Sequence, residues 1–256
     1  MLYHILHSLL VISCVTFILS SASMRYDHLK LRDIAFRKGK SGEAYCGKLL
    51  DRYGGIDRIE NLTMGNEADQ STAEIDFVVN CSTHLTVVEA KAWSGVISGS
   101  VDSEFWSILS PSGTRTFRKN PILQVTRHTD FLSHVQSIPR ERFQFAVVMT
   151  GDVVFADDFD TAPLAGIVFC KETIPAIRNV LLPWRGATNG QWVLPFWHTL
   201  VNYAYSEDQG KWQALHAKKI RKRRIITPAW ACMFAFSLLL LSVGSHVIAD
   251  MFSMQQ

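Results

Sequence analysis

The sequence predicts a mixed α/β domain with a small central sheet, set between two apolar segments near the ends of the chain. Short β-branched runs and helical stretches follow one another in the order helix, several strands, helix, strand, which is typical of a mixed α/β fold. The chain has 256 residues, of which 48% are hydrophobic. This is enough for one domain with a hydrophobic core plus appendages.

The two apolar segments, residues 1–24 and 225–249, contain no Asp, Glu, Lys or Arg. Each reaches the roughly 20 residues that a membrane-spanning helix needs. Basic residues follow the first segment and precede the second, and basic flanks stay in the cytoplasm. We therefore expect an N-terminal anchor and a C-terminal transmembrane helix in the inner (cytoplasmic) membrane, with the middle of the chain cytoplasmic. A cleaved signal peptide is the alternative for the first segment, and a buried core helix for the second.

The middle of the chain begins with a predicted helix and a predicted hairpin. The stretch "GEAYCGKLLDRY" (42–53) is expected to be helical, with Ser41 as its cap and Gly54-Gly55 as its stop. The runs "AEIDFVVN" (73–80) and "LTVVEAK" (85–91) are short, apolar and joined by a few polar residues. They are expected to form adjacent strands of a hairpin.

Further strands and helices follow. Strands are expected in "GVISGSV", "FWSIL", "TRTF", "FQFAVVMTG" and "AGIVFC". A helix should open at Asn120-Pro121, because Asn suits the cap and Pro the first helical position, and should run to about Ser137. Residues 171–182 and most of 191–224 are expected to be helical. We therefore divide the cytoplasmic part into a core, 38–137, and a second part, 138–224, that ends in a basic membrane-flanking helix.

The cysteines limit the kinds of chemistry that this middle part can carry. Two of the five lie in the apolar segments, and the other three have no close spacing. No zinc or redox motif is therefore indicated, and a reduced, cytosolic domain fits.

Three charged residues at the predicted hairpin indicate a hydrolytic site. Asp76 stands between apolar neighbours on the first strand, and Glu89 and Lys91 end the second. Side chains two apart on a strand share a face, and a hairpin can bring the carboxylates of Asp76 and Glu89 together. Two hard oxygen ligands suit Mg²⁺, and Lys91 would assist an attacking water or stabilise charge on a phosphate. A surface ion pair between Glu89 and Lys91 is the simpler interpretation.

Four motifs in order make this part of the chain resemble a known family. They are "GEAYCGKLL" with Glu43, "EIDF" with Asp76, "EAKAWSG" with Glu89 and Lys91, and "NPILQ" with Gln124. Together they resemble the nuclease-related domain family, often called NERD, and the segment looks like a member of the PD-(D/E)xK nuclease superfamily. The resemblance covers less than half of the chain. It implies a restriction-endonuclease-like fold and Mg²⁺-dependent cleavage of DNA.

The resemblance also implies a role for each motif residue. Asp76 and Glu89 would hold Mg²⁺ or Mn²⁺, Lys91 would assist the nucleophile, and Glu43 would add a carboxylate as a ligand or water-orienting group. Gln124 would line the site from the second helix. His128, one turn later on the same face, could touch substrate or site.

The expected partners are DNA and the membrane, and a homodimer would favour double-strand breaks. Two alternatives stay open: a non-catalytic nucleic-acid or protein-binding module at the membrane, and a hydrolase of another phosphodiester, such as a nucleotide second messenger.

Overall fold

The structure, a computed structural model, describes residues 23, 26, 30, 33–54, 57–182 and 193–220. Contacts divide the chain into two units, and the unit Arg37–His216 holds all the strands. Except for residue 23, the predicted transmembrane segments 1–24 and 225–249 lie outside the described residues. Within the ranges that are described, no helix is both long and apolar enough to cross a bilayer.

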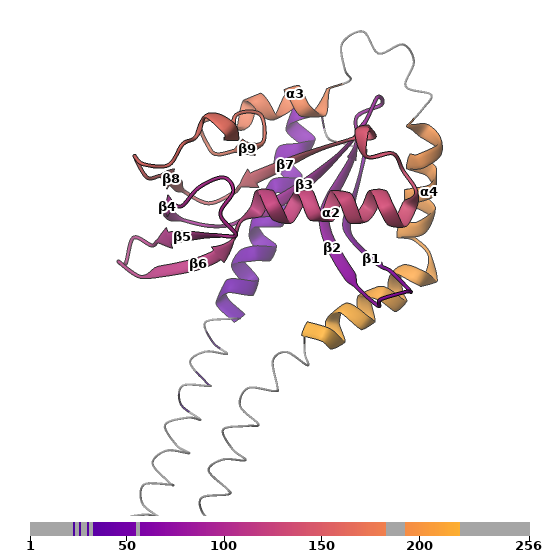
Figure 1. Cartoon of the computed structure of the whole chain (residues 1–256), viewed down its shortest axis with the longest axis horizontal. Helices are drawn as coiled ribbons and strands as arrows, with labels where there is room; N and C mark the ends of the chain where they lie inside the picture. Colours follow the sequence, from indigo (N-terminus) through magenta and orange to yellow (C-terminus); the bar gives the residue numbers. More distant parts are fainter. Residues whose placement is uncertain are drawn as a thin grey trace, which may run out of the picture. The chain divides into compact units, whose positions relative to one another are not determined.

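The first sheet has five strands in the order β1-β2-β3-β7-β9. Its members are β1 (Arg58–Gly65), β2 (Thr72–Asn80), β3 (Leu85–Lys91), β7 (Phe143–Met149) and β9 (Val168–Phe169). β2 pairs antiparallel with both β1 and β3, so the expected hairpin is present. β3 and β9 both run parallel to β7. The sheet is thus mixed, as expected, with β3 at its centre (Figure 1).

A second sheet of four strands, in the order β6-β5-β4-β8, departs from the expected single central sheet. Its members are β4 (Gly95–Ser98), β5 (Phe105–Leu109), β6 (Arg115–Lys119) and β8 (Val153–Phe155). β4 pairs in parallel with β8, directly downstream of the parallel pair β3 and β7. Two neighbouring strands therefore leave the first sheet and continue side by side into the second.

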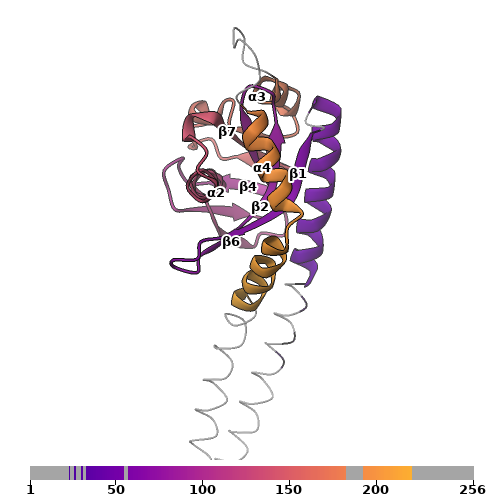
Figure 2. The same ribbon diagram turned by 90° about the vertical axis from the view of Figure 1, so that its right-hand side faces the viewer.

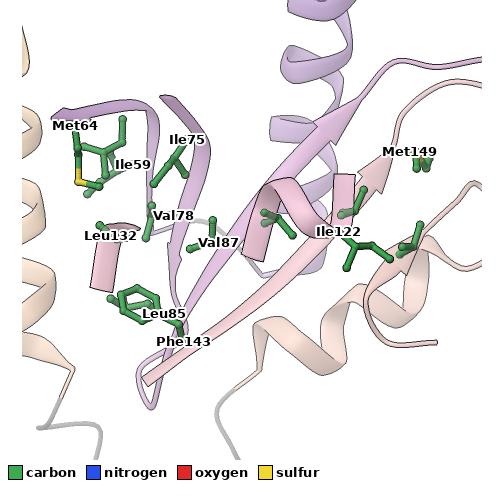
Figure 3. Packing of buried hydrophobic residues seen from close by; sticks show 14 of the residues in the cluster. Ile59, Met64, Ile75, Val78, Leu85, Val87, Ile122, Leu132, Phe143 and Met149 are labelled. Atoms are coloured by element: carbon green, nitrogen blue, oxygen red, sulfur yellow. The ribbon is translucent and has the colours of Figure 1, made fainter. Parts of the chain in front are cut away.

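Helices cover both faces of the five-stranded sheet. One buried cluster joins the sheet to α2 (Pro121–Gln136) and α4 (Leu194–Ala204), and includes the side chains of Val87, Ile122 and Leu132 (Figure 3). The other joins it to the helix 33–53 and to α3 (Arg178–Leu181). Figure 2 shows the helix 33–53 and α2 on opposite sides of the strands. The described part is therefore a mixed α/β fold with two mixed sheets flanked by helices.

The first helix is longer than expected. Residues 33–53 are helical without a break, so Ser41 lies inside the helix and does not cap it. Gly42 is buried at the point where this helix meets the end of β3. A Cβ atom on Gly42 would lie 2.6 Å from the Cβ of Ala92 and 2.6 Å from Oγ1 of Thr150. Glycine at this position therefore allows the helix to approach the strand ends closely.

The helix α2 begins as the sequence predicts. The Asn120 side chain accepts a hydrogen bond from the backbone nitrogen of Ile122 at 2.9 Å, and Pro121 is the first helical residue. The side-chain amide of Asn120 also donates to the carbonyl oxygens of Val101 (2.6 Å) and Ser103 (2.9 Å). The helix start is thereby fixed to the loop before β5, which sets where Gln124 lies.

The C-terminal part of the unit contains less regular structure than predicted. Residues 171–182 contain a 3₁₀ segment, η3 (Ile174–Ile177), followed by the single turn of α3. Two further 3₁₀ segments are η1 (Arg140–Arg142) and η2 (Ala162–Leu164). Residues 207–220 form a final helix, as expected. Its Trp212 is buried against Gly65 at the end of β1.

Candidate active site at the end of β3

The strands β2 and β3 bring Asp76 and Glu89 together. Phe77 pairs with Val88, so the next step of this antiparallel register sets Asp76 opposite Glu89. Regular pairing between the strands stops there. The Asp76 Oδ2 atom instead accepts the backbone N–H of Ala90 at 2.8 Å. The carboxylate of Asp76 thus lies at the point where β2 separates from β3.

The pairing between β1 and β2 is also interrupted at Asp76. The registered pairs Glu60–Phe77 and Leu62–Ile75 flank this position, but Asn61 and Asp76 are not paired. Asn61 has a φ of 54°, a left-handed conformation that Asn tolerates better than most residues. The local break frees the backbone around Asp76 from the regular ladder.

Glu89 is surrounded by donors. Its side chain is 3% exposed. The Oε1 atom accepts hydrogen bonds from the Lys91 ammonium and from Nε2 of Gln124, the latter at 2.7 Å. Nδ1 of His128 lies 3.3 Å from Oε2, close enough for an ion pair when the imidazole is protonated. Burial alone would raise the pKa of Glu89, but His128 and Lys91 together hold that pKa below its ordinary value.

The pKa of Asp76 is shifted in the opposite direction. Burial and, after it, the negative charge of Glu89 raise the pKa of Asp76 from 3.8 to about 8. The hydrogen bond from Ala90 and the charge of Lys91 oppose this shift without cancelling it. Two neighbouring carboxyl groups whose pKa values are moved apart are typical of functional sites, although structural ion pairs can do the same.

The helix 33–53 contributes Glu43 at the rim of this cluster. Its carboxylate accepts a hydrogen bond from the Lys40 ammonium at 2.7 Å, and Lys40 also donates to the Asn61 side chain at 2.9 Å. The charges of Glu43 and Asp76 both help to raise the pKa of Lys40, against the effect of its burial. Glu43 is therefore near Asp76 electrostatically but is bonded to Lys40.

The cluster lies where the two sheets meet. The backbone N–H of Thr150, just after β7, donates to the Lys91 carbonyl at 2.9 Å. Lys38 Nζ donates to Ser94 Oγ at 3.1 Å, three residues after Lys91. Trp93 packs edge-on against Trp106 of β5, with ring centroids 6.5 Å apart. The end of β3 is thus held by the first helix, by β7 and by the second sheet.

The donor set fits a hard divalent cation bound by two carboxylates. Asp76 and Glu89 present oxygen ligands. The raised pKa of Asp76 reflects burial and, after it, the negative charge of Glu89, and a bound cation would favour the ionised carboxylate against both. Mg²⁺ commonly takes one or two carboxylates and completes its shell with water and substrate phosphate. No group of three or more His, Cys, Asp or Glu side chains suited to a metal occurs in the part of the chain that is described. The pair Asp76 and Glu89 is therefore the candidate, with Glu43 outside it.

Sequence reasoning placed five side chains in one cluster: Glu43, Asp76, Glu89, Lys91 and Gln124. The structure brings the last four together and places Glu43 at the rim, bonded to Lys40. Sequence reasoning did not predict that Lys40 and Asn61 lie at this site. The only signal for Lys40 was its spacing, three residues before Glu43 on one helix. His128, one turn from Gln124, lies directly beside Glu89.

Comparison with known proteins gives one match. Residues 38–150 match the family model described as the nuclease-related domain. The comparisons with curated proteins and with solved structures give no significant match. The matched segment contains the first helix from residue 38, the hairpin that holds Asp76 and Glu89, the helix α2 and the strand β7. The resemblance that the four sequence motifs indicated is thus confirmed for residues 38–150, which match the nuclease-related domain (NERD) family.

Proposed function

We propose that this protein is a metal-dependent nuclease that hydrolyses phosphodiester bonds of DNA. The observation that carries the proposal is the pair Asp76 and Glu89, opposite each other at a strand end, with Glu89 buried and the Lys91 ammonium bonded to it. The match to the nuclease-related domain supports a nuclease-related function in general. The choice of DNA and Mg²⁺ (or Mn²⁺), and a restriction-endonuclease-like arrangement of the core, are parts of the proposal.

Each side chain has a distinct task in the proposed reaction. Asp76 and Glu89 would hold the cation, which supplies charge stabilisation to the phosphate and acidity to a bound water. The Lys91 ammonium would orient the attacking water and stabilise the negative charge that develops on the phosphate. Gln124 fixes the Glu89 carboxylate from the side of α2 by its hydrogen bond. Glu43, held by Lys40, would orient water at the rim.

The proposal is tested by DNA cleavage with the full-length chain and Mg²⁺. We expect Lys91→Ala, Glu89→Gln and Asp76→Asn each to reduce the rate by about 100-fold or more. Lys91→Ala removes a positioned group that stabilises the developing charge, which typically costs that much, and the other two variants remove a carboxylate that would hold the cation. The matched control is Asp130→Asn, which removes an exposed carboxylate from α2, the helix that carries Gln124. This control should cleave at the parent rate.

Two outcomes would redirect the proposal. Cleavage that survives all three substitutions would remove the pair from catalysis. No cleavage at all, combined with retained binding of DNA, would favour the non-catalytic module. Parallel assays with RNA and cyclic dinucleotides separate a DNA nuclease from a hydrolase of another phosphodiester.

Membrane anchoring through 1–24 and 225–249, with the catalytic unit in the cytoplasm, belongs to the same proposal. The support is the placement of Lys and Arg on the inner flanks of both apolar segments. A second copy of the chain would let the enzyme cut both strands of a duplex, and a homodimer is therefore part of the proposal for double-strand breaks.

A further inference from the structure

The second sheet presents one apolar face to solvent. Among the described residues of the unit Arg37–His216, nine large hydrophobic side chains are exposed, and five of them belong to the four strands of this sheet. These five are Val96 (38% exposed), Phe105 (46%), Leu109 (36%), Phe117 (70%) and Val154 (66%). Exposed apolar groups that gather in one place mark binding surfaces more often than scattered ones do.

Strand register puts all five on the same side of the sheet. Val96 pairs with Leu109 and with Val154 in neighbouring strands. Phe105 and Leu109 share a face of β5 because side chains two apart point the same way. Phe117 pairs with Ser107, which lies between them. We call this the outer face.

The opposite side of the sheet is buried. Trp106 is fully buried there and packs edge-on against Phe155 and Phe159, with ring centroids 6.1 and 5.3 Å away. The outer face is therefore exposed because nothing in the described unit covers it, while the sheet itself is anchored in the core.

The charged residues of the four strands are all basic. None of its four strands contains Asp or Glu, and β6 contains Arg115, Arg118 and Lys119, all exposed. Arg115 and Lys119 stand two residues on either side of Phe117, and hence on the outer face with it. Arg115 is held on the sheet by a hydrogen bond from its Nη1 to Ser107 Oγ at 3.0 Å.

We propose that the outer face binds single-stranded nucleic acid, with bases stacked on Phe117 and Phe105 and phosphates contacted by Arg115 and Lys119. Aromatic side chains and cations that alternate on an open sheet are the combination by which proteins hold single strands without sequence preference. A duplex hides its base faces, so exposed Phe rings favour an unpaired strand. The charge of the face is complementary to a polyanion.

The position of the sheet links this surface to the candidate active site. β4 begins at Gly95, four residues after Lys91, which is at most about 14 Å of chain. A strand held on the outer face would therefore lie within a few nucleotides of the Asp76–Glu89 pair. This inference rests on the proposed nuclease function for its biological meaning, and it names a single strand as the form of substrate that the enzyme holds.

The test measures the binding of a fluorescein-labelled oligothymidine to the full-length chain by fluorescence anisotropy in EDTA. The oligonucleotide has about 16 nucleotides, which is long enough to fill at least one binding site. We expect Phe117→Ala to weaken binding at least fivefold, within the range of one lost stacking contact. Lys119→Gln should lower the slope of log K against log salt by about 0.7. The matched controls are Tyr205→Ala, an 87% exposed aromatic outside the sheet, and Lys48→Gln on the first helix. Neither control should change binding.

The outcomes separate this inference from the nuclease proposal, because binding is measured without metal or cleavage. If binding of the oligonucleotide depends on Phe117 but the protein never cleaves DNA, the outer face is supported as a binding surface and the nuclease proposal is rejected. If the protein cleaves DNA but its binding of the oligonucleotide does not change in the Phe117 and Lys119 variants, the nuclease proposal stands and the outer face is not the binding surface. Two assays address other occupants: flotation with phosphatidylcholine–phosphatidylglycerol vesicles, and molar mass by light scattering. A Phe117-dependent result in either, without Phe117-dependent binding of the oligonucleotide, would overturn the inference in favour of a lipid surface or a second copy.

Discussion

Asp76 is placed unfavourably for the folded chain on its own. Its half-buried carboxyl group lies beside a second, ionised carboxylate, and no cation among the described residues is bonded to it in the way that Lys91 is bonded to Glu89. A carboxylate of this kind destabilises a protein unless another group compensates for its charge. Its position between Ile75 and Phe77 therefore supports the proposal that a cation binds there.

The first prediction concerns the dependence of stability on pH in the absence of metal. The pKa of Asp76 is raised to about 8 in the folded chain from an ordinary value of 3.8. Between these values the folded chain holds a proton that the unfolded chain has lost, so the stability contributed by the neutral carboxyl is lost as the pH rises toward 8. The slope from this group is at most about 1.4 kcal/mol per pH unit.

Asp76→Asn should abolish this slope, and urea unfolding in EDTA at pH values from 5 to about 8 would measure it. Glu89 does not produce the same trend, because its pKa is lowered and its contribution is lost only as the pH falls. Added Mg²⁺ should flatten the slope of the parent protein but not change Asp76→Asn. An equal slope in parent and variant would show that Asp76 is ionised throughout.

At the scale of elements, some of the fold follows from local sequence and some does not. The start of α2 was predictable because Asn120 and Pro121 act through neighbouring backbone groups. The β2–β3 hairpin was predictable because a short polar link joins two apolar runs. β1 was missed because "RIENLTMG" mixes charged and polar residues with its apolar ones, so it shows no clear alternation. The division into two sheets was missed because it depends on β4 pairing with β8, far along the chain.

The candidate site, like the fold, could be predicted only in part from the sequence. A register of two strands joined by a short link could place Asp76 opposite Glu89 from the sequence. The interruption at Asn61 could not be foreseen, since it depends on a strand that the sequence did not reveal. Nor could the bond between Lys40 and Glu43, because the first helix was expected to begin only at Gly42.

The second prediction concerns the contact between the first helix and the end of β3. Gly42→Ala would place a Cβ atom 2.6 Å from Ala92 Cβ and from Thr150 Oγ1, so the helix must shift. We expect a loss of about 1–3 kcal/mol, as for other overpacked positions, and slower cleavage because Glu43 moves with the helix.

Gly39→Ala is the control in the same helix, since a Cβ atom there meets nothing within 4 Å. It should stabilise the protein by about 0.5–1 kcal/mol through helix propensity. Urea denaturation measures both variants. A Gly42→Ala protein as stable as Gly39→Ala would show that the contact is loose.

At the scale of the whole molecule, the family segment does not contain all of the folded unit. Residues 38–150 end just after β7, whereas β8 completes the second sheet and β9 completes the first. A chain cut at residue 150 would leave the edges of β4 and β7 without these partners. Strand edges without partners promote aggregation, so residues beyond the family segment are needed for a stable unit.

The third prediction concerns topology. With basic residues on the inner flanks of both apolar segments, the middle of the chain should remain in the cytoplasm. Alkaline phosphatase, which is active only after export, should be active when fused after Gln256 and inactive when fused after Gly210. The reverse pattern would place the catalytic unit on the other side of the membrane.

The parallel pairing of β3 with β7 has a consequence for biosynthesis. The hairpin that carries Asp76 and Glu89 is complete once Lys91 has left the ribosome, but the second neighbour of β3 ends only at Met149. Between them the chain must make β4, β5, β6 and the crossover helix that supplies Gln124. A nascent chain therefore carries its two carboxylates well before Gln124, which fixes Glu89 from α2. Hydrolytic competence should appear only late in translation, when β7 has docked.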